Sequence, residues 1–241
     1  VGGEAIDFPA SVQNVVIRNG TLLGASTGLD GRELVEANCL FEGIRSCSNS
    51  FAGIYAGSGC VIRDCDAWAN SSYGIRVIRG TNSIVQNCRI FDNPSIGLEV
   101  TGAGAYVDNN VVKGNGVNYS ISSGHQLNIL LCEIPETLRW PCSVKLAGTL
   151  TMADTTTNGI TVVADNVTID LNGHALVGPG ASGYEGIYQP GSYRGLAIKN
   201  GMICNWRGSS KYAANIWGEN ASFESLLVTS NSYGLYGGWG S

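Results

Sequence analysis

The fold is decided by a short pattern that recurs in register along the first half of the chain. It reads FEGIRSCSNSFAGI at 41–54, IRDCDAWANSSYGI at 62–75 and VQNCRIFDNPSIGL at 85–98, with a weaker form, VDNNVVKGNGVNYS, at 107–120. The short apolar stretches of each copy are broken by Gly, Asn and Ser. Such stretches are typical of short strands joined by turns.

One Asn of the pattern sets its period. Asn49, Asn70, Asn93 and Asn115 follow one another at nearly equal intervals, and a further copy near the end carries Asn231. A unit of about 22 residues with two or three short strands cannot bury its apolar face alone, so such units must stack. The sequence therefore predicts an all-β fold, a right-handed parallel β-helix with coils of about 22 residues.

The same Asn column has a structural interpretation. Identical side-chain amides on successive coils can donate and accept hydrogen bonds along a ladder, and Asn tolerates the left-handed backbone that corners need. A binding role would not require the same residue on every coil. We therefore interpret Asn49, Asn70, Asn93, Asn115 and Asn231 as structural.

The pattern resembles the repeats of right-handed parallel β-helix proteins, a broad group that includes pectate lyases, tailspikes and many secreted bacterial proteins. The resemblance rests on NVVIRNGTLLG from Asn14, GIYAGSGCVIRDCDAWAN from Gly53, VQNCRIFDN from Val85 and GITVVADNVTIDLNGHALVG from Gly159. The last motif is similar to the coil with which such domains commonly begin. The resemblance covers nearly the whole chain except 125–145, and it implies a fold rather than an activity.

The sequence contains a second, longer repeat in addition to the short one. EAIDFPASVQNVVIRNG at 4–20 aligns without gaps with EGIYQPGSYRGLAIKNG at 185–201. The match continues, so that residues 182–241 repeat residues 1–60. The motif with which such domains commonly begin therefore lies in the middle of the chain, and coils that should follow it lie at the start. This order indicates parts of two tandem modules, the end of one followed by the beginning of the next.

These modules predict the domain organisation. We expect residues 1–124 to be the C-terminal part of one β-helix module, 125–145 a linker and 146–241 the N-terminal part of the next. The linker is either a short amphipathic helix over the end of a stack or the strands of a transition coil. Cys132 and Cys142 flank it at a loop length that a disulfide closes easily, so they are the best disulfide candidate.

Four other cysteines fall at equivalent positions of adjacent coils. Cys39 aligns with Cys60, and Cys65 aligns with Cys88. We interpret them as stacked core thiols rather than bridges, because cysteine behaves as a small hydrophobic residue in such columns. The spacing of Cys and His does not suggest a zinc site.

Composition and charge exclude several functions. Charged residues make up 14% of the chain and hydrophobic residues 44%, which excludes a charged coiled coil and most disordered chains. The formal net charge of −5 argues against a broad phosphate-binding surface, so we expect no nucleic-acid partner. No apolar run reaches the roughly 18 residues that span a bilayer, so we expect no membrane span.

The pattern gives no catalytic, cofactor-binding or metal-binding residues. Outward charges fall as opposite-sign neighbours on adjacent coils, Asp66 beside Arg89 and Arg76 beside Glu99, and such pairs are ordinary on a solvated sheet. The remaining carboxylates are too few for a calcium cage, and no Ser, His and acid set shares a register.

Outward aromatic residues are a separate candidate surface. Trp68 and Phe91 share a column on successive coils, and Tyr55 precedes the column of Arg76 and Glu99, so a small aromatic strip can face solvent. The strip suits either a glycan or lateral packing against a loop or a neighbouring chain. We favour lateral packing.

The ends of the solenoid suggest a function. A parallel solenoid exposes strand edges and apolar core at both ends unless caps block further stacking, and the sequence shows no convincing cap. We predict a structural, self-assembling unit of an extracellular or cell-surface fibre or layer, stacked head to tail as a homopolymer or belonging to a longer tandem chain. The alternative is a carbohydrate-active enzyme, such as a polysaccharide lyase or hydrolase, or a glycan-binding module.

Overall fold

The chain folds into two compact units, Val1–Leu127 and Asn128–Ser241, here called unit 1 and unit 2. The computed structural model describes residues 2–153, 155–181 and 183–238, in which every regular element is a β-strand. Within each unit, equivalent strands of successive coils pair in parallel. Each unit is therefore a parallel β-solenoid, and the predicted fold class is confirmed.

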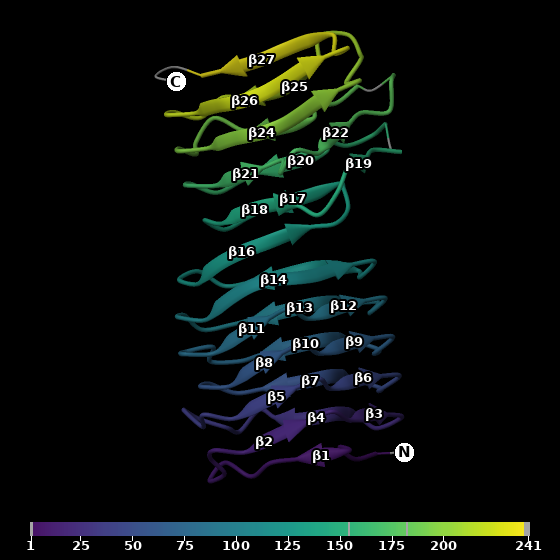
Figure 1. The fold of residues 1–241 in the computed structure, drawn as a ribbon, viewed down its shortest axis with the longest axis vertical. Coiled ribbons are helices and arrows are strands. Elements are labelled where there is room, and N and C mark those ends of the chain that lie inside the picture. Colours follow the sequence, from purple (N-terminus) through teal and green to yellow (C-terminus); the bar gives the residue numbers. More distant parts are fainter. Residues whose placement is uncertain (1, 154, 182, 239–241) are drawn as a thin grey trace. The chain divides into compact units, whose positions relative to one another are not determined.

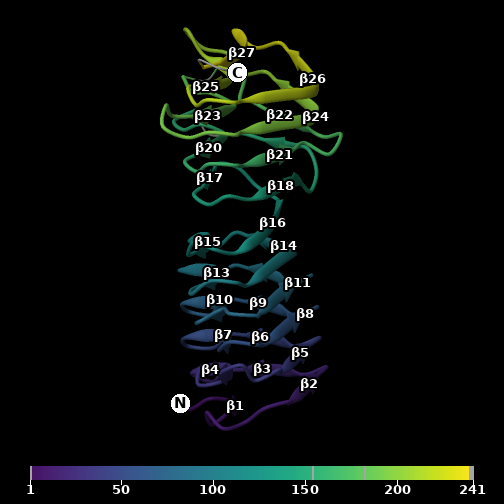
Figure 2. The ribbon, with the colours of Figure 1, turned by 90° about the vertical axis from the view of Figure 1, so that its left-hand side faces the viewer.

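One side of unit 1 is a six-stranded sheet, here called sheet A, with the order β1-β4-β7-β10-β13-β15. These strands lie above one another in Figures 1 and 2, and Figure 2 labels all six. Their bounds are β1 (Ile6–Asp7), β4 (Thr27–Gly31), β7 (Ala52–Ala56), β10 (Tyr73–Val77), β13 (Ile96–Val100) and β15 (Val117–Ile121).

The other side of unit 1 is bent, because each coil contributes two short strand segments with a corner between them. We call it the bent face. Its strands are β2 (Val16–Arg18), β3 (Thr21–Leu23), β5 (Leu40–Glu42), β6 (Arg45–Cys47), β8 (Val61–Arg63), β9 (Asp66–Trp68), β11 (Ile84–Gln86), β12 (Arg89–Phe91) and the longer β14 (Tyr106–Lys113). The corner residues share a positive φ: Asn19, Gly43, Asp64, Asn87 and Asn109.

Unit 2 has the same two-sided plan (Figure 2). Its sheet C comprises β17 (Glu136–Leu138), β20 (Ile160–Val162), β23 (Ile187–Gln189), β25 (Tyr212–Ile216) and β27 (Tyr233–Gly237). Its bent face comprises β18 (Ser143–Leu146), β19 (Leu150–Thr151), β21 (Thr168–Asp170), β22 (Ala175–Val177), β24 (Ala197–Cys204) and β26 (Ser222–Thr229). From Asn128 onward, β16 (Gln126–Leu131) pairs with β18.

The core consists of inward-facing rows that repeat from coil to coil. In unit 1, Phe41, Ile62 and Val85 are fully buried and aligned on adjacent strands. The side chains on either side of each core residue point outward, which is the period-2 alternation of a strand. Rows of this kind explain why the short apolar stretches of the sequence recur at one spacing.

The cysteines of unit 1 behave as the sequence predicts. Cys39, Cys60, Cys65 and Cys88 are buried free thiols. Burial raises the pKa of Cys60 to about 12, and the hydrogen bond with Cys65 raises the pKa of Cys88. They are packed as core residues, and the prediction of stacked thiols rather than bridges is confirmed.

The segment 125–145 forms strands rather than a helix. It contains parts of β16 and β18 and the whole of β17, so the transition-coil interpretation holds. Cys142 is a buried free thiol. The disulfide expected with Cys132 is therefore absent from the structure, and the Cys132 thiol donates to the Leu130 carbonyl oxygen at 3.5 Å. The division into tandem modules with a linker stays a prediction.

Candidate functional site

The Asn column of unit 1 is a continuous hydrogen-bonded ladder. The side-chain amide nitrogen of Asn49 donates to Oδ1 of Asn70 at 2.9 Å, Asn70 donates to Asn93 at 3.1 Å, and Asn93 donates to Asn115 at 2.9 Å. The first three of these residues are buried. Since these amides bond one another and the backbone, the ladder is a structural element rather than a binding surface.

The ladder residues do not themselves supply the left-handed backbone expected at this corner. That conformation belongs to the residue before each of them, namely Ser48, Ala69, Asp92 and Gly114, with φ between 52° and 64°. The preceding residue turns the chain, and this turn aims the Asn side chain into the interior. The selection for Asn therefore comes from its hydrogen bonds and not from its backbone preference.

A glycine column leaves the space that the ladder occupies. A Cβ atom added at Gly53 would lie 2.8 Å from Nδ2 of Asn70, and one at Gly74 would lie 2.8 Å from Nδ2 of Asn93. Both distances are shorter than real Cβ contacts. The carbonyl oxygen of the Gly on the next coil lies closer still, at 2.6 Å for Gly53 and 2.7 Å for Gly74, so these positions require Gly because of both the amide and the neighbouring backbone.

Unit 2 fills the equivalent corner differently. Oδ1 of Asn231 accepts from the backbone N–H of Trp206 at 2.9 Å, as Oδ1 of Asn70 accepts from the N–H of Asn49 at 3.2 Å. Trp206 therefore occupies the ladder position, fully buried, and its indole N–H donates to the Leu176 carbonyl oxygen at 3.3 Å. The sequence interpretation placed Asn231 in a ladder but did not identify Trp206.

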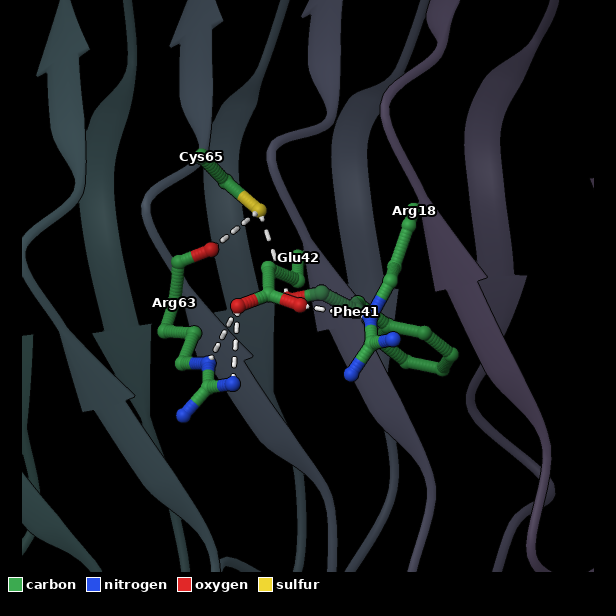
Figure 3. Close-up of polar contacts among 5 residues, drawn as sticks. All are labelled: Arg18, Phe41, Glu42, Arg63 and Cys65. Carbon is green, nitrogen blue, oxygen red and sulfur yellow. Dashed lines mark hydrogen bonds and ion pairs between the residues drawn. The ribbon is translucent and has the colours of Figure 1, made fainter.

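The outward side of the bent face in unit 1 carries two charged rows. The first charged row contains Arg18, Glu42 and Arg63, in register on adjacent strands. Figure 3 shows Glu42 between the two guanidinium groups, with 2.6 Å from Glu42 Oε2 to Arg18 Nε and 2.7 Å from Glu42 Oε1 to Arg63 Nη2. The carboxylate thus has both oxygens engaged.

The second charged row lies across the corner. It contains Arg45, Asp66 and Arg89 in register. Arg89 binds Asp66 through two hydrogen bonds of 2.7 and 2.6 Å, which raise the pKa of Arg89, and Arg45 Nε lies 4.0 Å from Asp66 Oδ2. The expected pairing of Asp66 with Arg89 is confirmed, and so is that of Arg76 with Glu99 on sheet A.

Trp68 and Phe91 form the aromatic pair expected beside this row. Their ring centroids are 5.8 Å apart with an interplanar angle of 6°. Each ring therefore covers one face of the other, and that face is not open to a sugar. This geometry favours the packing interpretation over the glycan interpretation, and contact with a neighbouring chain stays a prediction.

Tyr55 does not extend the aromatic strip, which corrects the expected surface of three residues. It lies in β7 on sheet A and is only 6% exposed. The guanidinium carbons of Arg32 and Arg76 lie 5.4 and 4.9 Å from its ring centroid. Tyr55 points outward as its register requires, but these two cations cover its faces.

The structure brings together one Ser–His pair that the sequence did not indicate. Nε2 of His125 lies 3.1 Å from Oγ of Ser122, and Nδ1 accepts from the Ala105 N–H at 3.0 Å. Neutral His125 therefore carries its proton on Nε2. The Ser122 hydroxyl donates to the Gly102 carbonyl oxygen at 2.6 Å. His125 cannot accept the serine proton in this arrangement, so the pair is not a nucleophile and base.

A shallow hollow of about 290 Å³ lies at the corner of the first coils of unit 1, lined by Asn19, Gly20, Thr21, Gly43 and Arg45. Arg45 is its one charged lining residue among those the structure describes, and it faces Asp66. The hollow contains no pair of carboxylates for acid–base chemistry.

Metal ligands and membrane-spanning helices are two further features on which a function could rest. Across 2–153, 155–181 and 183–238, no group of three or more His, Cys, Asp or Glu side chains is arranged to hold a metal ion. In these ranges no helix is long and apolar enough to cross a membrane.

Parallel coils, a buried ladder and paired outward charges define a β-solenoid as the class of this protein. A family model described as "Right handed beta helix region" matches residues 4–134, which is more than half of the chain. The chain therefore belongs to the right-handed β-helix family, as its repeats suggest. No curated protein and no solved structure matches the chain.

Proposed function

We propose that this chain is a structural, self-assembling β-helical unit of an extracellular or cell-surface fibre or layer, which stacks head to tail with further copies or belongs to a longer tandem-repeat chain. The observation that supports this proposal most directly is the solvent exposure of the core rows in the first and last described coils. Inward side chains that are fully covered in the neighbouring coils are partly exposed there. A further coil on each, from a second copy or from a longer tandem chain, would cover them and would pair the strand edges.

The C-terminal coil of unit 2 provides one such surface. Leu235 in β27 is 38% exposed, although Ala214, its partner in β25, is fully buried. Phe223 in β26 is half-buried, whereas Ile198, its partner in β24, is 1% exposed.

The N-terminal coil of unit 1 provides the other surface. Ile6 and Ile17 are half-buried, although their register partners, Leu29 and Phe41, are fully buried. Since β1 and β2 each pair with one described strand, their other edges can accept a further parallel strand. Two different surfaces of one molecule make a heterologous contact, which grows into filaments rather than closed dimers.

The outward faces support this proposal rather than an enzyme or a glycan-binding module. The carboxylates of both charged rows in unit 1 are engaged by arginines, and Trp68 and Phe91 cover each other. A polysaccharide lyase or hydrolase needs carboxylates that are available to a cation or a proton.

Negative-stain electron microscopy and light scattering over a range of concentrations test the proposal. We expect filaments, or particles with several times the mass of one chain, that grow with concentration. Leu235→Lys should suppress assembly because it places a charge in the covered row. Leu227→Lys is the matched control, since Leu227 lies outward on the same coil and is 59% exposed. Monodisperse particles with the mass of a single chain at high concentration would contradict the proposal.

A further inference from the structure

We infer that unit 1 has a side-by-side contact with further copies of this chain, which pack around the corner of the bent face in a closed ring and all point the same way. The inference goes beyond the proposed function and does not depend on stacking, because it uses outward residues of the bent face and not the ends of the solenoid. It rests on the order of charged and apolar side chains on the two sides of the corner.

The bent face is convex at its corner. In each coil one strand lies before the corner and one after it, and the middle residues of both strands point into the same core. Ile62 of β8 and Ala67 of β9, for example, are both fully buried. We call the side of β2, β5, β8 and β11 flank I, and the side of β3, β6, β9 and β12 flank II. The long strand β14 contributes to both flanks.

The two charged rows have opposite signs at equal height on either side of the corner. In the coil of β5 and β6, Glu42 lies on flank I and Arg45 on flank II. In the coil of β8 and β9, Arg63 lies on flank I and Asp66 on flank II. The ion pairs of these four side chains run along the rows, as Figure 3 shows for Glu42 and Arg63. The opposite signs across the corner can therefore pair with a neighbouring copy.

An apolar row lies outside each charged row. The first apolar row, on flank I, consists of Val16, Leu40, Val61, Ile84 and Tyr106. The second apolar row, on flank II, consists of Leu23, Cys47, Trp68 and Phe91. These side chains point outward and are half-buried or exposed. Apolar side chains that continue from coil to coil on an outward face are typical of an interaction surface.

Rotation about an axis along the corner fixes the register of the contact. It places flank I of one copy against flank II of the next without a shift along the solenoid, so each coil meets the same coil. The rows nearest the corner then meet, with Glu42 opposite Arg45 and Arg63 opposite Asp66. The outer rows meet as apolar pairs, namely Leu40 with Cys47, Val61 with Trp68 and Ile84 with Phe91.

The charges disfavour other registers of the same contact. A shift of one coil in one direction would place Arg63 opposite Arg45. A shift in the other direction would place Glu42 opposite Asp66. Like charges at a contact are unfavourable and suppress wrong arrangements. The unshifted register avoids both, and it is the register that a closed ring requires.

The corner residues would line the axis of the ring. Four of them are Asn or Gly, and Asp64 is the charged one. Its carboxylates would approach one another at the axis, so Asp64 opposes ring closure. Asp64→Asn gives this coil the residue that Asn87 and Asn109 provide at the same corner with the same positive φ. We expect this variant to fold and to associate more tightly, by up to about fivefold.

A disulfide across the contact measures the register and the number of copies. Leu40→Cys places a thiol opposite the half-buried free thiol of Cys47 in the next copy, whereas these two positions of one chain lie on opposite flanks. With glutathione disulfide as oxidant, each thiol pair gives one interchain disulfide and two molecules of glutathione. We expect covalent rings on a non-reducing denaturing gel. Val61→Cys is the matched control, because it lies in the same row but one coil away from Cys47.

Charge reversal tests the strength of the contact. Arg45→Glu places two carboxylates opposite each other, at Glu42 and position 45. We expect the dissociation constant from sedimentation velocity to rise by at least about tenfold. Arg194→Glu in unit 2 is the matched control, since the two arginine side chains are 67% and 66% exposed and each lies near one carboxylate. Both variants are made with Leu235→Lys, which removes the stacking contact, and circular dichroism melts check that they fold.

The outcomes separate this contact from the proposed function. If Leu40→Cys gives no more interchain product than Val61→Cys, and Arg45→Glu associates like Arg194→Glu, the side-by-side contact is wrong. Filaments of the unmodified chain would then still support the proposed function. Covalent rings from Leu40→Cys without filaments of the unmodified chain would support the side-by-side contact and contradict stacking.

Discussion

The two units share a coil design but fill one corner of the coil in different ways. In unit 1 the corner holds a chain of amides from Asn49 to Asn115. In unit 2 it holds one buried indole, Trp206, one coil before Asn231. The flanking sequences 4–20 and 185–201 repeat one another, so the difference lies in the filling and not in the backbone plan.

The comparison of the two units shows the role of the glycine column. A Cβ at Gly159 or Gly186 would lie 2.7 or 2.9 Å from Trp206 ring atoms, and one at Gly97 would lie 2.6 Å from Nδ2 of Asn115. In both units glycines leave room for the corner residue. The corner can then hold either a polar ladder that extends with each coil or a large apolar group that contacts several coils at once.

The largest expected effect comes from removing the indole. Trp206→Ala should destabilise unit 2 by about 3 to 5 kcal/mol, because it leaves a cavity against glycines that cannot fill it. Chemical denaturation measures this loss. Trp217→Ala is the control, since Trp217 is 54% exposed and should cost far less. Equal losses for the two variants would mean that Trp206 does not support the core.

A second change at the same position sharpens the comparison. Trp206→Asn restores a ladder residue next to Asn231, so it should be more stable than Trp206→Ala, although less stable than the unmodified chain because the cavity remains. The same denaturation experiment ranks the three proteins. If Asn and Ala are equivalent at this position, the corner of unit 2 does not accept a ladder.

Breaking the ladder in unit 1 should have the next largest effect. Asn70→Ala removes four hydrogen bonds, to Asn49 N and Nδ2, the Ser46 carbonyl oxygen and Asn93 Oδ1. The buried N–H of Asn49 loses its ladder acceptor, whereas Asn49 Nδ2 keeps Ser46 Oγ and Asn93 Oδ1 keeps the backbone N–H of residue 70. We expect a loss of about 2 to 3 kcal/mol in the free energy of unfolding, measured by chemical denaturation.

The control for the ladder is an exposed Asn at another corner. Asn87 has a positive φ and its side chain bonds Asn109. Because Gly adopts a positive φ without strain, Asn87→Gly should lower the free energy of unfolding much less than Asn70→Ala. Similar losses at the two positions would show that the corner backbone, and not the amide ladder, stabilises unit 1.

The sequence predicted the repeating elements and missed the exceptions. A ladder needs the same residue on every coil, so Asn49, Asn70 and Asn93 appear as a periodic signal. Trp206 occurs once, so no period shows it. The feature that could have identified Trp206 is its position. It lies one coil before Asn231 and directly follows Asn205, whose φ is positive like that of the residue before each ladder Asn.

Contacts between side chains could be predicted from the sequence only in part. Register alone predicted the partners Asp66 with Arg89 and Arg76 with Glu99, because parallel coils place them side by side. The burial of Tyr55 also depends on Arg32, which follows β4 and whose position no register predicts. Pairings within the regular coils were therefore predictable, and contacts made by loop residues were not.

The glycine column offers a smaller test of the same design. A Cβ at Gly74 would lie 2.4 Å from Ile90 Cγ2 and 2.7 Å from the Gly97 carbonyl oxygen. Gly74→Ala should therefore cost about 1 to 3 kcal/mol. Gly20→Ala is the control, because no atom lies within 4 Å of its added Cβ. If both variants unfold at the same denaturant concentration, the column has no steric role.

The smallest expected effect is a pH dependence at the last coil of unit 1. Desolvation lowers the pKa of His125 from its usual 6.5, against a smaller opposing contribution from the Gly102 backbone. The unfolded chain then binds the proton more readily than the folded one. The stabilising contribution of neutral His125 is therefore complete above pH 6.5 and is lost as the pH falls below 6.5 towards the folded-state pKa.

The contacts of His125 give a variant that isolates this contribution. Protonation of Nδ1 would place two N–H donors against each other, His125 and Ala105, whereas a Gln side chain can accept from Ala105 at any pH. The difference in unfolding free energy between the unmodified chain and His125→Gln should therefore shrink or change sign between pH 7.5 and 5.5. A constant difference over that interval would mean that His125 titrates equally in the folded and unfolded chain, and that the last coil of unit 1 is not sensitive to protonation.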